Sequence, residues 1–473
     1  MKYPDHSIQL GASCGPKLAE MKDSTILNAD GEVRANSRSR LFFVGDNSSN
    51  ANWGRAASLA LRQLLSESFD ITGNVAGAFF DLSTADAGYI GTLMPGRYYG
   101  LFKQLMRRRW RRPYSWYFQL EHWFGAKDLI DENPAVSVDN LLTHKRRYPA
   151  LARMYQQAEQ ADFLLADGDG DIIFSTPPRR NTLCLLALME LGIRLKKPVF
   201  LVNSMISDCP QTGRNQQTLM YATRLMTQCR AVALRDAQSY EYVRREMPDA
   251  NSFLVPDSLF TWYPLYSGHA EDTRNSPDSQ VPDPETWAYK STFDFSRPYI
   301  CIGGGALAGS QPGNALQSYS NLVKKVAQLG YGICLTENDR PDSFLQTIAR
   351  DLNVGFVPVD APIQFCGAVL ANARLFISGR YHPSIFASLG GTPCIFLATH
   401  AHKMGSLAEV LQYESPRQFN GFPGESEISE IVGLAKTYLA GGESLRVRIR
   451  KVAKSRCEEA SQLPSLLMRH LNG

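Results

Sequence analysis

The chain alternates short apolar runs with amphipathic stretches of helical period, and it does so twice. In the first half, "RLFFVGD" (Arg40–Asp46) predicts a buried strand, and "RAASLALRQLLSESF" after it predicts an amphipathic helix. The same order recurs from "ADFLLADGDGDIIF" (Ala161–Phe174) through "KPVFLVNSM" and "RAVALRD" to "NSFLVPD". Strands that alternate with helices favour parallel sheets covered on both faces, so the chain is expected to be an α/β protein.

A polar stretch rich in Pro, Ser and Asp separates the two halves, and the alternation restarts at "PYICIGGG" and runs to "TPCIFL". The pattern predicts two Rossmann-like domains with a cleft between them. We expect an irregular segment at 1–38, an N-terminal domain at 39–262, a linker at 263–297 and a C-terminal domain at 298–473. In such sheets ligands bind beyond the carboxyl ends of the strands.

The charge and hydropathy of the chain argue against a nucleic-acid partner and against a membrane-spanning segment. The 50 basic and 46 acidic residues leave a net charge of only +4, which does not favour nucleic acid. The start, "MKYPDHSIQLGASCGPK", lacks the apolar core of a signal peptide, and no run of about 18 apolar residues could span a bilayer. The expected location is the cytoplasm.

The loop "SGRYHP" (Ser378–Pro383) lies where a predicted strand, "RLFISG", gives way to a helix. Pro383 suits the first helical position and biases His382 away from the helical region. If the loop is extended, Arg380 and His382 point to one side, at a helix N-terminus that favours an anion. They would then bind a phosphate or carboxylate and transfer protons; alternatively, Arg380 pairs with a carboxylate across the domain boundary and His382 caps the helix.

Two further strand ends point to the same cleft. In "ALRDAQS", Arg235 ends a strand before a possible capping residue, Asp236, and either binds an anion or forms a surface ion pair. The loop "GDNSSNANWGR" is either a ligand loop or a well-capped turn. Its candidate residues are Asp46, Asn47, Asn52, Trp53 and Arg55.

No metal site is expected. The alternating aspartates of "DGDGD" (Asp167–Asp171) would suit Mg²⁺, but such residues more often cap helices and form turns. In "THAHK", His400 and His402 lack a third ligand, while Lys403 adds a cation to the rim of the cleft. The chain also lacks a GxSxG elbow, an HExxH pair and a kinase motif set. Anion binding with proton transfer is the chemistry that remains.

A basic and aromatic stretch, "GRYYGLFKQLMRRRWRRPYSWYFQLEHWFG", interrupts the pattern. It is either a solvated basic helix face or a contact with an anionic membrane surface or a lipid-linked substrate. Its arginines are Arg107, Arg108, Arg109, Arg111 and Arg112.

Taken in order, several of these motifs resemble the polysaccharide pyruvyl transferase family. They are "NWGRAASLALRQLL", "GDGDIIF", "VALRDAQSYEYVRRE" with "VPDSLF", and "SGRYHPSIFASLGGTPCIFLATHAHKMGSL", and the resemblance as a whole spans roughly Phe42 to Leu411. The GRYH loop with the downstream Lys403 is the most specific element. Members often read "GEGSIHH" where this chain reads "GDGDIIF", so a histidine of that pattern is absent here.

The resemblance implies a GT-B-like enzyme with no cofactor. Such an enzyme moves the pyruvyl group of phosphoenolpyruvate onto a sugar of a cell-surface polysaccharide, or of its lipid-linked precursor, as a ketal. The C-terminal domain would bind the donor and the N-terminal domain the acceptor, with His382 and Arg380 catalytic. The substrate-binding residues would be Arg235, Asp46, Asn47, Asn52, Trp53, Arg55, Asp169, Tyr381, Ser384 and Lys403.

Two rival interpretations stay open. A GT-B glycosyltransferase that uses a nucleotide-activated sugar has the same architecture and also needs arginine and histidine near a phosphate. A non-catalytic relative that binds an anionic glycan is the other, and the absent histidine of the "GDGDIIF" segment suggests it.

Overall fold

The computed structural model describes residues 38–75, 129–146, 148–267, 293–399, 401–414 and 417–472. The described residues from Ser39 onward belong to one compact unit. The arginine-rich stretch, Arg107 to Arg112, lies outside the described residues, as does the predicted N-terminal segment up to residue 37. The predicted domain boundaries stay a prediction.

The first six-stranded sheet is entirely parallel, in the order β2-β1-β3-β5-β7-β8. Its register pairs Val44 of β1 with Ala166 of β3. Its strands are β1 (Arg40–Val44), β2 (Asp70–Val75), β3 (Phe163–Asp167), β5 (Val199–Ser204), β7 (Ala231–Leu234) and β8 (Ser252–Leu254). A small parallel pair, β4 (Ile172–Phe174) and β6 (Ile206–Asp208), lies apart from it. The "IIF" segment, where the family pattern has histidine, is thus the buried strand β4.

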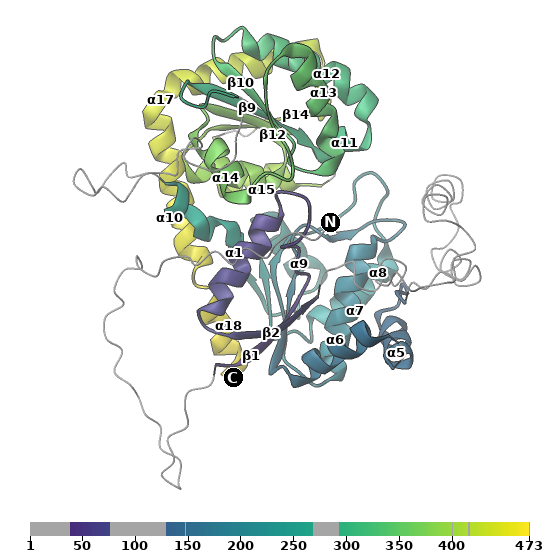
Figure 1. Ribbon diagram of the computed structural model, residues 1–473. Coiled ribbons are helices and arrows are strands. Elements are labelled where there is room, and N and C mark those ends of the chain that lie inside the picture. The colour runs from purple at the N-terminus through teal and green to yellow at the C-terminus, as the bar shows by residue number, and fades with distance from the viewer. Residues whose placement is uncertain are drawn as a thin grey trace, which may run out of the picture. The chain divides into compact units, whose positions relative to one another are not determined.

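Alternation along the strands explains why helices cover both faces of this sheet, because successive side chains point to opposite faces. Phe42 and Val44 pack into one core with the helices α5 to α9, whereas Leu41 and Phe43 pack into another with α1. Figure 1 shows α5 to α8 grouped on one side and α1 on the other. The helices are α1 (Arg55–Ser66), α5 (Pro134–His144), α6 (Pro149–Gln160), α7 (Arg180–Arg194), α8 (Gln216–Met226) and α9 (Ala237–Glu246).

The second sheet is also entirely parallel, in the order β11-β10-β9-β12-β13-β14. Its strands are β9 (Tyr299–Gly305), β10 (Gly332–Thr336), β11 (Gly355–Val357), β12 (Leu375–Gly379), β13 (Cys394–Leu397) and β14 (Gln418–Phe419). Its helices are α11 (Ala306–Ser310), α12 (Pro312–Ala327), α13 (Phe344–Leu352), α14 (Ile363–Asn372), α15 (Tyr381–Leu389), α16 (Lys403–Val410) and the 3-10 turn η3 (Arg340–Ser343). Two parallel sheets covered by helices confirm the predicted α/β class.

Among the described residues, two segments run from one half to the other. The turn η1 (Ser258–Trp262) and helix α10 (Tyr263–Tyr266) follow β8, and the rings of Trp262 and Tyr266 lie 6.0 and 5.6 Å from Phe386 of α15. Helix α17 (Glu425–Ala460), interrupted by non-helical dihedrals at Gly442, leads to α18 (Leu463–Asn472). No helix in the described ranges combines the length and apolar character that crossing a bilayer requires.

Candidate active site

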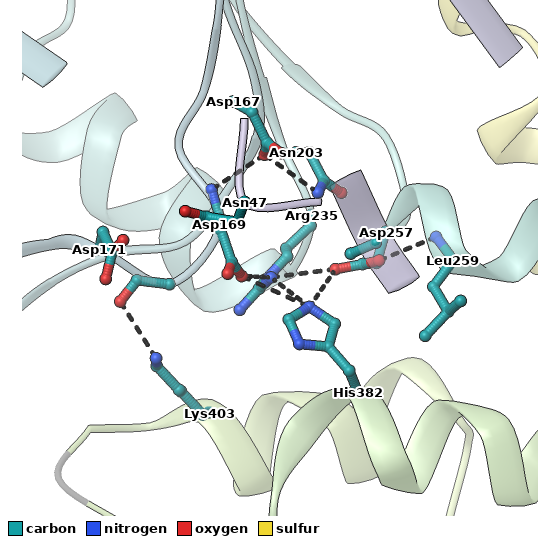
Figure 2. A network of polar contacts seen from close by, with 12 residues as sticks. Asn47, Asp167, Asp169, Asp171, Asn203, Arg235, Asp257, Leu259, His382 and Lys403 are labelled. Carbon is teal, nitrogen blue, oxygen red and sulfur yellow. Dashed lines mark hydrogen bonds and ion pairs between the residues drawn. The ribbon is translucent and has the colours of Figure 1, made fainter. Parts of the chain in front are cut away.

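The candidate site is built from residues that follow the carboxyl ends of strands in both sheets. Asp169, Arg235 and Asp257 follow β3, β7 and β8 of the first sheet. His382 and Lys403 follow β12 and β13 of the second. Parallel strands present their carboxyl ends at one edge, so these side chains meet (Figure 2).

Arg235 is the centre of the cluster. Its side chain is fully buried, and Nη1 donates to Asp169 Oδ1 at 2.7 Å and to Asp257 Oδ2 at 3.0 Å. The guanidinium also lies over the ring of Tyr381, 4.1 Å from its centroid. No described residue hydrogen-bonds its Nε or Nη2. Because buried polar groups normally have partners, these free donors suit an anionic ligand.

His382 approaches Arg235 from the second half of the chain. Its Nε2 lies 3.3 Å from Arg235 Nη1 and 3.4 Å from the nearest oxygens of Asp169 and Asp257. Only 7% of the residue is exposed. An imidazole held beside an arginine and two carboxylates can act as a general acid and base.

The conformation of the GRYH loop differs from the prediction. Helix α15 begins at Tyr381, so His382 is helical and Pro383 occupies the third helical position instead of the first. A proline is tolerated there because the N–H groups of the first helical turn have no partner within the helix. The extended loop that would place Arg380 and His382 on one side is therefore not formed.

Arg380 binds carboxylates of its own half. Nε and Nη2 donate to Asp342 at 3.0 and 2.7 Å, and Nη1 donates to Asp339 at 3.0 Å. Arg380 thus forms an ion pair, as the alternative interpretation expected, but with partners on β10–η3 and not across to the first half. Burial raises the pKa of Asp342 to about 6, although Arg380 opposes the shift.

Lys403 joins the cluster beside Arg235. Its Nζ donates to the carbonyl oxygen of Gly170 at 3.0 Å. A Cβ at Gly170 would overlap this amine and would lie 3.3 Å from Arg235 Nη2, so the two cations converge over the glycine. Burial, the largest cause, lowers the pKa of Lys403 to about 8.

The carboxylates around these cations are held ionised. Burial alone would raise the pKa of Asp169, but the cationic groups around it lower the value to about 2. Burial opposes ionisation of Asp257 as well, and the neighbouring His382 and Arg235 keep its pKa below the usual value. The ionised carboxylates of Asp169 and Asp257 therefore lie next to the cationic side chains of the cluster.

The other aspartates of the "DGDGD" loop have protein partners. Asp167 accepts from Ser58 Oγ at 2.8 Å and from Asn203 Nδ2 at 3.2 Å, and burial raises its pKa well above the usual value. Asp171 accepts from Asn181 Nδ2 at 3.2 Å. Within the described ranges no three His, Cys, Asp or Glu residues are grouped to hold a metal ion.

Two residues of α15 that were predicted to bind the substrate are buried. The Ser384 hydroxyl donates to the carbonyl oxygen of Arg380 at 2.8 Å, which stabilises the first turn of the helix. Tyr381 is 5% exposed, and no described residue hydrogen-bonds its hydroxyl. The ring of Tyr381 stacks on the Arg235 guanidinium, while its hydroxyl has no hydrogen-bond partner among the described residues.

The first residues of the loop after β1 contact only the first half of the chain, and its later residues contact the second half. Asp46 accepts from Arg62 Nη1 and Ser48 N at 2.8 and 2.9 Å, and Asn47 Oδ1 accepts from Asn50 at 3.0 Å. These contacts fit the capped-turn interpretation. They involve only the first half.

The next residues of the loop reach the second half. Asn52 forms an antiparallel bridge with Asp339, and the amide of Trp53, a fully buried residue, donates to Asn338 O at 2.9 Å. Arg55 Nη2 donates to Ala361 O at 2.9 Å. These contacts link the two halves of the chain next to His382.

Sequence reasoning missed Asp257, Asp339 and Asp342 as partners of the site arginines. Asp257 does end the run "NSFLVPD" at the carboxyl end of a strand, which is the signal that identified Arg235. Asp339 and Asp342 follow β10 in the same way. The strand-end rule could therefore have placed all three near the site, although it does not show which arginine each one pairs with.

Comparisons with known proteins concern the family and the fold of the chain. The family model "Polysaccharide pyruvyl transferase" matches residues 97–401, more than half of the chain. No curated protein matches the sequence. A structure from Listeria monocytogenes, assigned as a UDP-N-acetylglucosamine 2-epimerase, is 12% identical with a TM-score of 0.50 and covers 92% of this chain and 97% of its own.

A second structure, Anabaena Alr3699/HepE in complex with UDP and glucose, is also 12% identical, with a TM-score of 0.49. It covers 92% of this chain and 100% of its own. At such identities the similarity concerns the fold alone. The arrangement of two parallel sheets is the GT-B-like one that the sequence predicted.

Proposed function

Because the chain belongs to the polysaccharide pyruvyl transferase family, we propose that it transfers the pyruvyl group of phosphoenolpyruvate to a saccharide as a ketal. The acceptor is a sugar of a cell-surface polysaccharide or of its lipid-linked precursor. The observation that carries this proposal is the convergence of Arg235, His382 and Lys403 from two sheets, with two donor atoms of Arg235 left unpaired.

The donor has the charges that such a site suits. Phosphoenolpyruvate carries a carboxylate and a phosphate, and both pair well with guanidinium and ammonium groups. We assign these contacts to Arg235 Nε and Nη2 and to Lys403. Arg380, held by Asp339 and Asp342, shapes the first turn of α15.

The reaction balances with one proton donor and two acceptor hydroxyls. The methylene carbon gains a proton and becomes a methyl group, while C2 forms two C–O bonds and its bond to the phosphate oxygen breaks. The two hydroxyls release two protons. One of these protons replaces the proton that was given to the methylene carbon, and the other leaves with the phosphate. His382 is the residue we assign to these transfers, and the cations offset the charge that builds on the leaving phosphate.

Ligand binding tests the donor. Phosphoenolpyruvate alone should raise the thermal unfolding temperature of the protein, since a ligand that binds only the folded state stabilises it. UDP- and CMP-sugars should not. Stabilisation by a nucleotide sugar without any by phosphoenolpyruvate would instead support a GT-B glycosyltransferase.

Turnover tests the reaction. Incubation with phosphoenolpyruvate and a panel of glycosides with neighbouring hydroxyls should release phosphate and produce a new ketal methyl signal in NMR spectra. His382→Gln should abolish both, because glutamine cannot exchange a proton. If the donor binds but no glycoside is ever pyruvylated, the chain is a non-catalytic relative.

A further inference from the structure

The two ring nitrogens of His382 lie in different surroundings. Nε2 faces Arg235 at 3.3 Å and the carboxylates of Asp169 and Asp257, both at 3.4 Å (Figure 2). Nδ1 has no hydrogen-bond partner among the residues that the structure describes. Gly54, in the first half of the chain, lies beside Nδ1, because a Cβ at Gly54 would be 3.1 Å from this nitrogen.

Arg235 restricts which form of the ring fits. Its Nη1 carries two hydrogens, and these point to Asp169 at 2.7 Å and to Asp257 at 3.0 Å. Both contacts are shorter than the 3.3 Å contact to His382 Nε2, so the imidazole can only share a hydrogen that Nη1 already directs to a carboxylate. A lone pair on Nε2 would then face two carboxylate oxygens, which is repulsive, whereas an N–H there donates to them.

Asp257 is the better fixed of the two carboxylates. Its side chain is fully buried, and Oδ1 accepts from the amide of Leu259 at 2.9 Å, at the start of η1. The other oxygen, Oδ2, faces both Arg235 and His382. Asp169, in contrast, has 21% of its side chain exposed.

We infer that Asp257 is a positioning residue that holds a hydrogen on Nε2 of His382, so that Nδ1 is the nitrogen that exchanges a proton with the substrate. This inference rests on the proposed function, in which His382 is the acid and base. On protonation of the donor, the Nδ1–H bond breaks and the π electrons of the enol form the new C–H bond. The ring, which begins this step as the imidazolium with a hydrogen on each nitrogen, becomes neutral with its hydrogen on Nε2. The Nδ1 lone pair can then accept a hydroxyl proton, which restores the imidazolium.

Gly54 leaves the space that this role of Nδ1 requires. A Cβ at Gly54 would lie 3.1 Å from Nδ1 and 3.6 Å from Cε1 of His382, and 3.1 Å from Oδ1 of Asn52. The backbone of Gly54 is ordinary right-handed helical, φ −62° and ψ −21°, so alanine could adopt it without strain. The glycine is therefore explained by the open space beside Nδ1 and not by its conformation.

The tautomer can be measured without turnover. In ¹⁵N-labelled protein at a pH where the ring is neutral, long-range ¹H–¹⁵N spectra should show His382 with its hydrogen on Nε2. The signals are assigned by their loss in His382→Gln. Asp257→Asn should shift the population toward the Nδ1–H form, while Asp171→Asn, which changes a nearby carboxylate without contact to the ring, should not.

A substitution at Gly54 tests the open face. Gly54→Ala should lower kcat on the order of tenfold to a hundredfold, because a methyl group beside Nδ1 displaces the reacting atoms. Its unfolding temperature should change little. The control is Gly313→Ala on α12, where a Cβ meets open space and both activity and stability should be retained.

These outcomes separate the inference from the proposed function. A wild-type ring with its hydrogen on Nδ1, an unchanged tautomer in Asp257→Asn, or full activity of Gly54→Ala would each overturn the inference. Should Asp257→Asn not fold, the wild-type spectrum and Gly54→Ala still decide. Wild-type protein that binds no phosphoenolpyruvate would refute the proposed function, whatever the spectra show.

Discussion

Lys403 is a partly buried amine, and its surroundings make its charge depend on pH near neutrality. Burial lowers its pKa from 10.5 to about 8, while Asp169 and Asp171 oppose the shift. The folded state therefore releases this proton at lower pH than the unfolded state. The contribution of Lys403 to stability accordingly rises between about pH 8 and 10.5, where only the unfolded chain still binds the proton.

Binding of the donor should show the opposite trend. If the Lys403 ammonium contacts phosphoenolpyruvate, the dissociation constant should rise above about pH 8, by about tenfold per pH unit for one proton. Calorimetric titrations between pH 7 and 10 measure this slope. Lys403→Arg, which stays charged, should bind with no such slope; an unchanged slope in that variant would assign the titration to another group.

Arg380 ties the first turn of α15 to the turn η3. Asp342 is fully buried, and the Arg380 side chain is 16% exposed. Arg380→Met would leave a buried carboxylate without its cation, which costs about 3–5 kcal/mol of unfolding free energy. Urea denaturation measures this loss.

The matched control is Arg350→Met, since Arg350 pairs with Asp351 on the surface, where both side chains are more than half exposed. It should change the unfolding free energy by less than about 0.5 kcal/mol. Adding Asp342→Leu to Arg380→Met should restore most of the stability, because apolar replacements of buried pairs are often neutral. Failure of this rescue would mean that Arg380 stabilises the turn by other contacts.

The sequence predicted these elements well where the strand pattern is strong. Arg235 and His382 were identified because each follows an apolar strand, β7 or β12, and the fold brings those ends together. The start of α15 was misplaced because proline only biases the residue before it. Likewise, no local pattern shows that Asp342, and not a ligand, receives the guanidinium of Arg380.

Long-range packing is the part that periodicity does not reveal. The linear pattern predicted that residues 298–473 form the C-terminal domain. In the structure, Leu463, Leu466 and Leu467 of α18 share a core with Phe43 and Leu165 of the first sheet. An amphipathic helix needs an apolar partner, but its sequence does not say which sheet supplies one.

This packing predicts that the end of the chain stabilises its beginning. Leu467 is fully buried, so Leu467→Ala should lower the unfolding free energy by about 2–5 kcal/mol. The neighbouring Met468 is 39% exposed, and Met468→Ala should change it by less than about 0.5 kcal/mol. Hydrogen exchange should place the loss of protection in Leu467→Ala on β1 and β3, which are distant in sequence, because those strands line the same core. If amide protection were lost only within α18, the first sheet would not depend on this helix for its stability, and the prediction would be wrong.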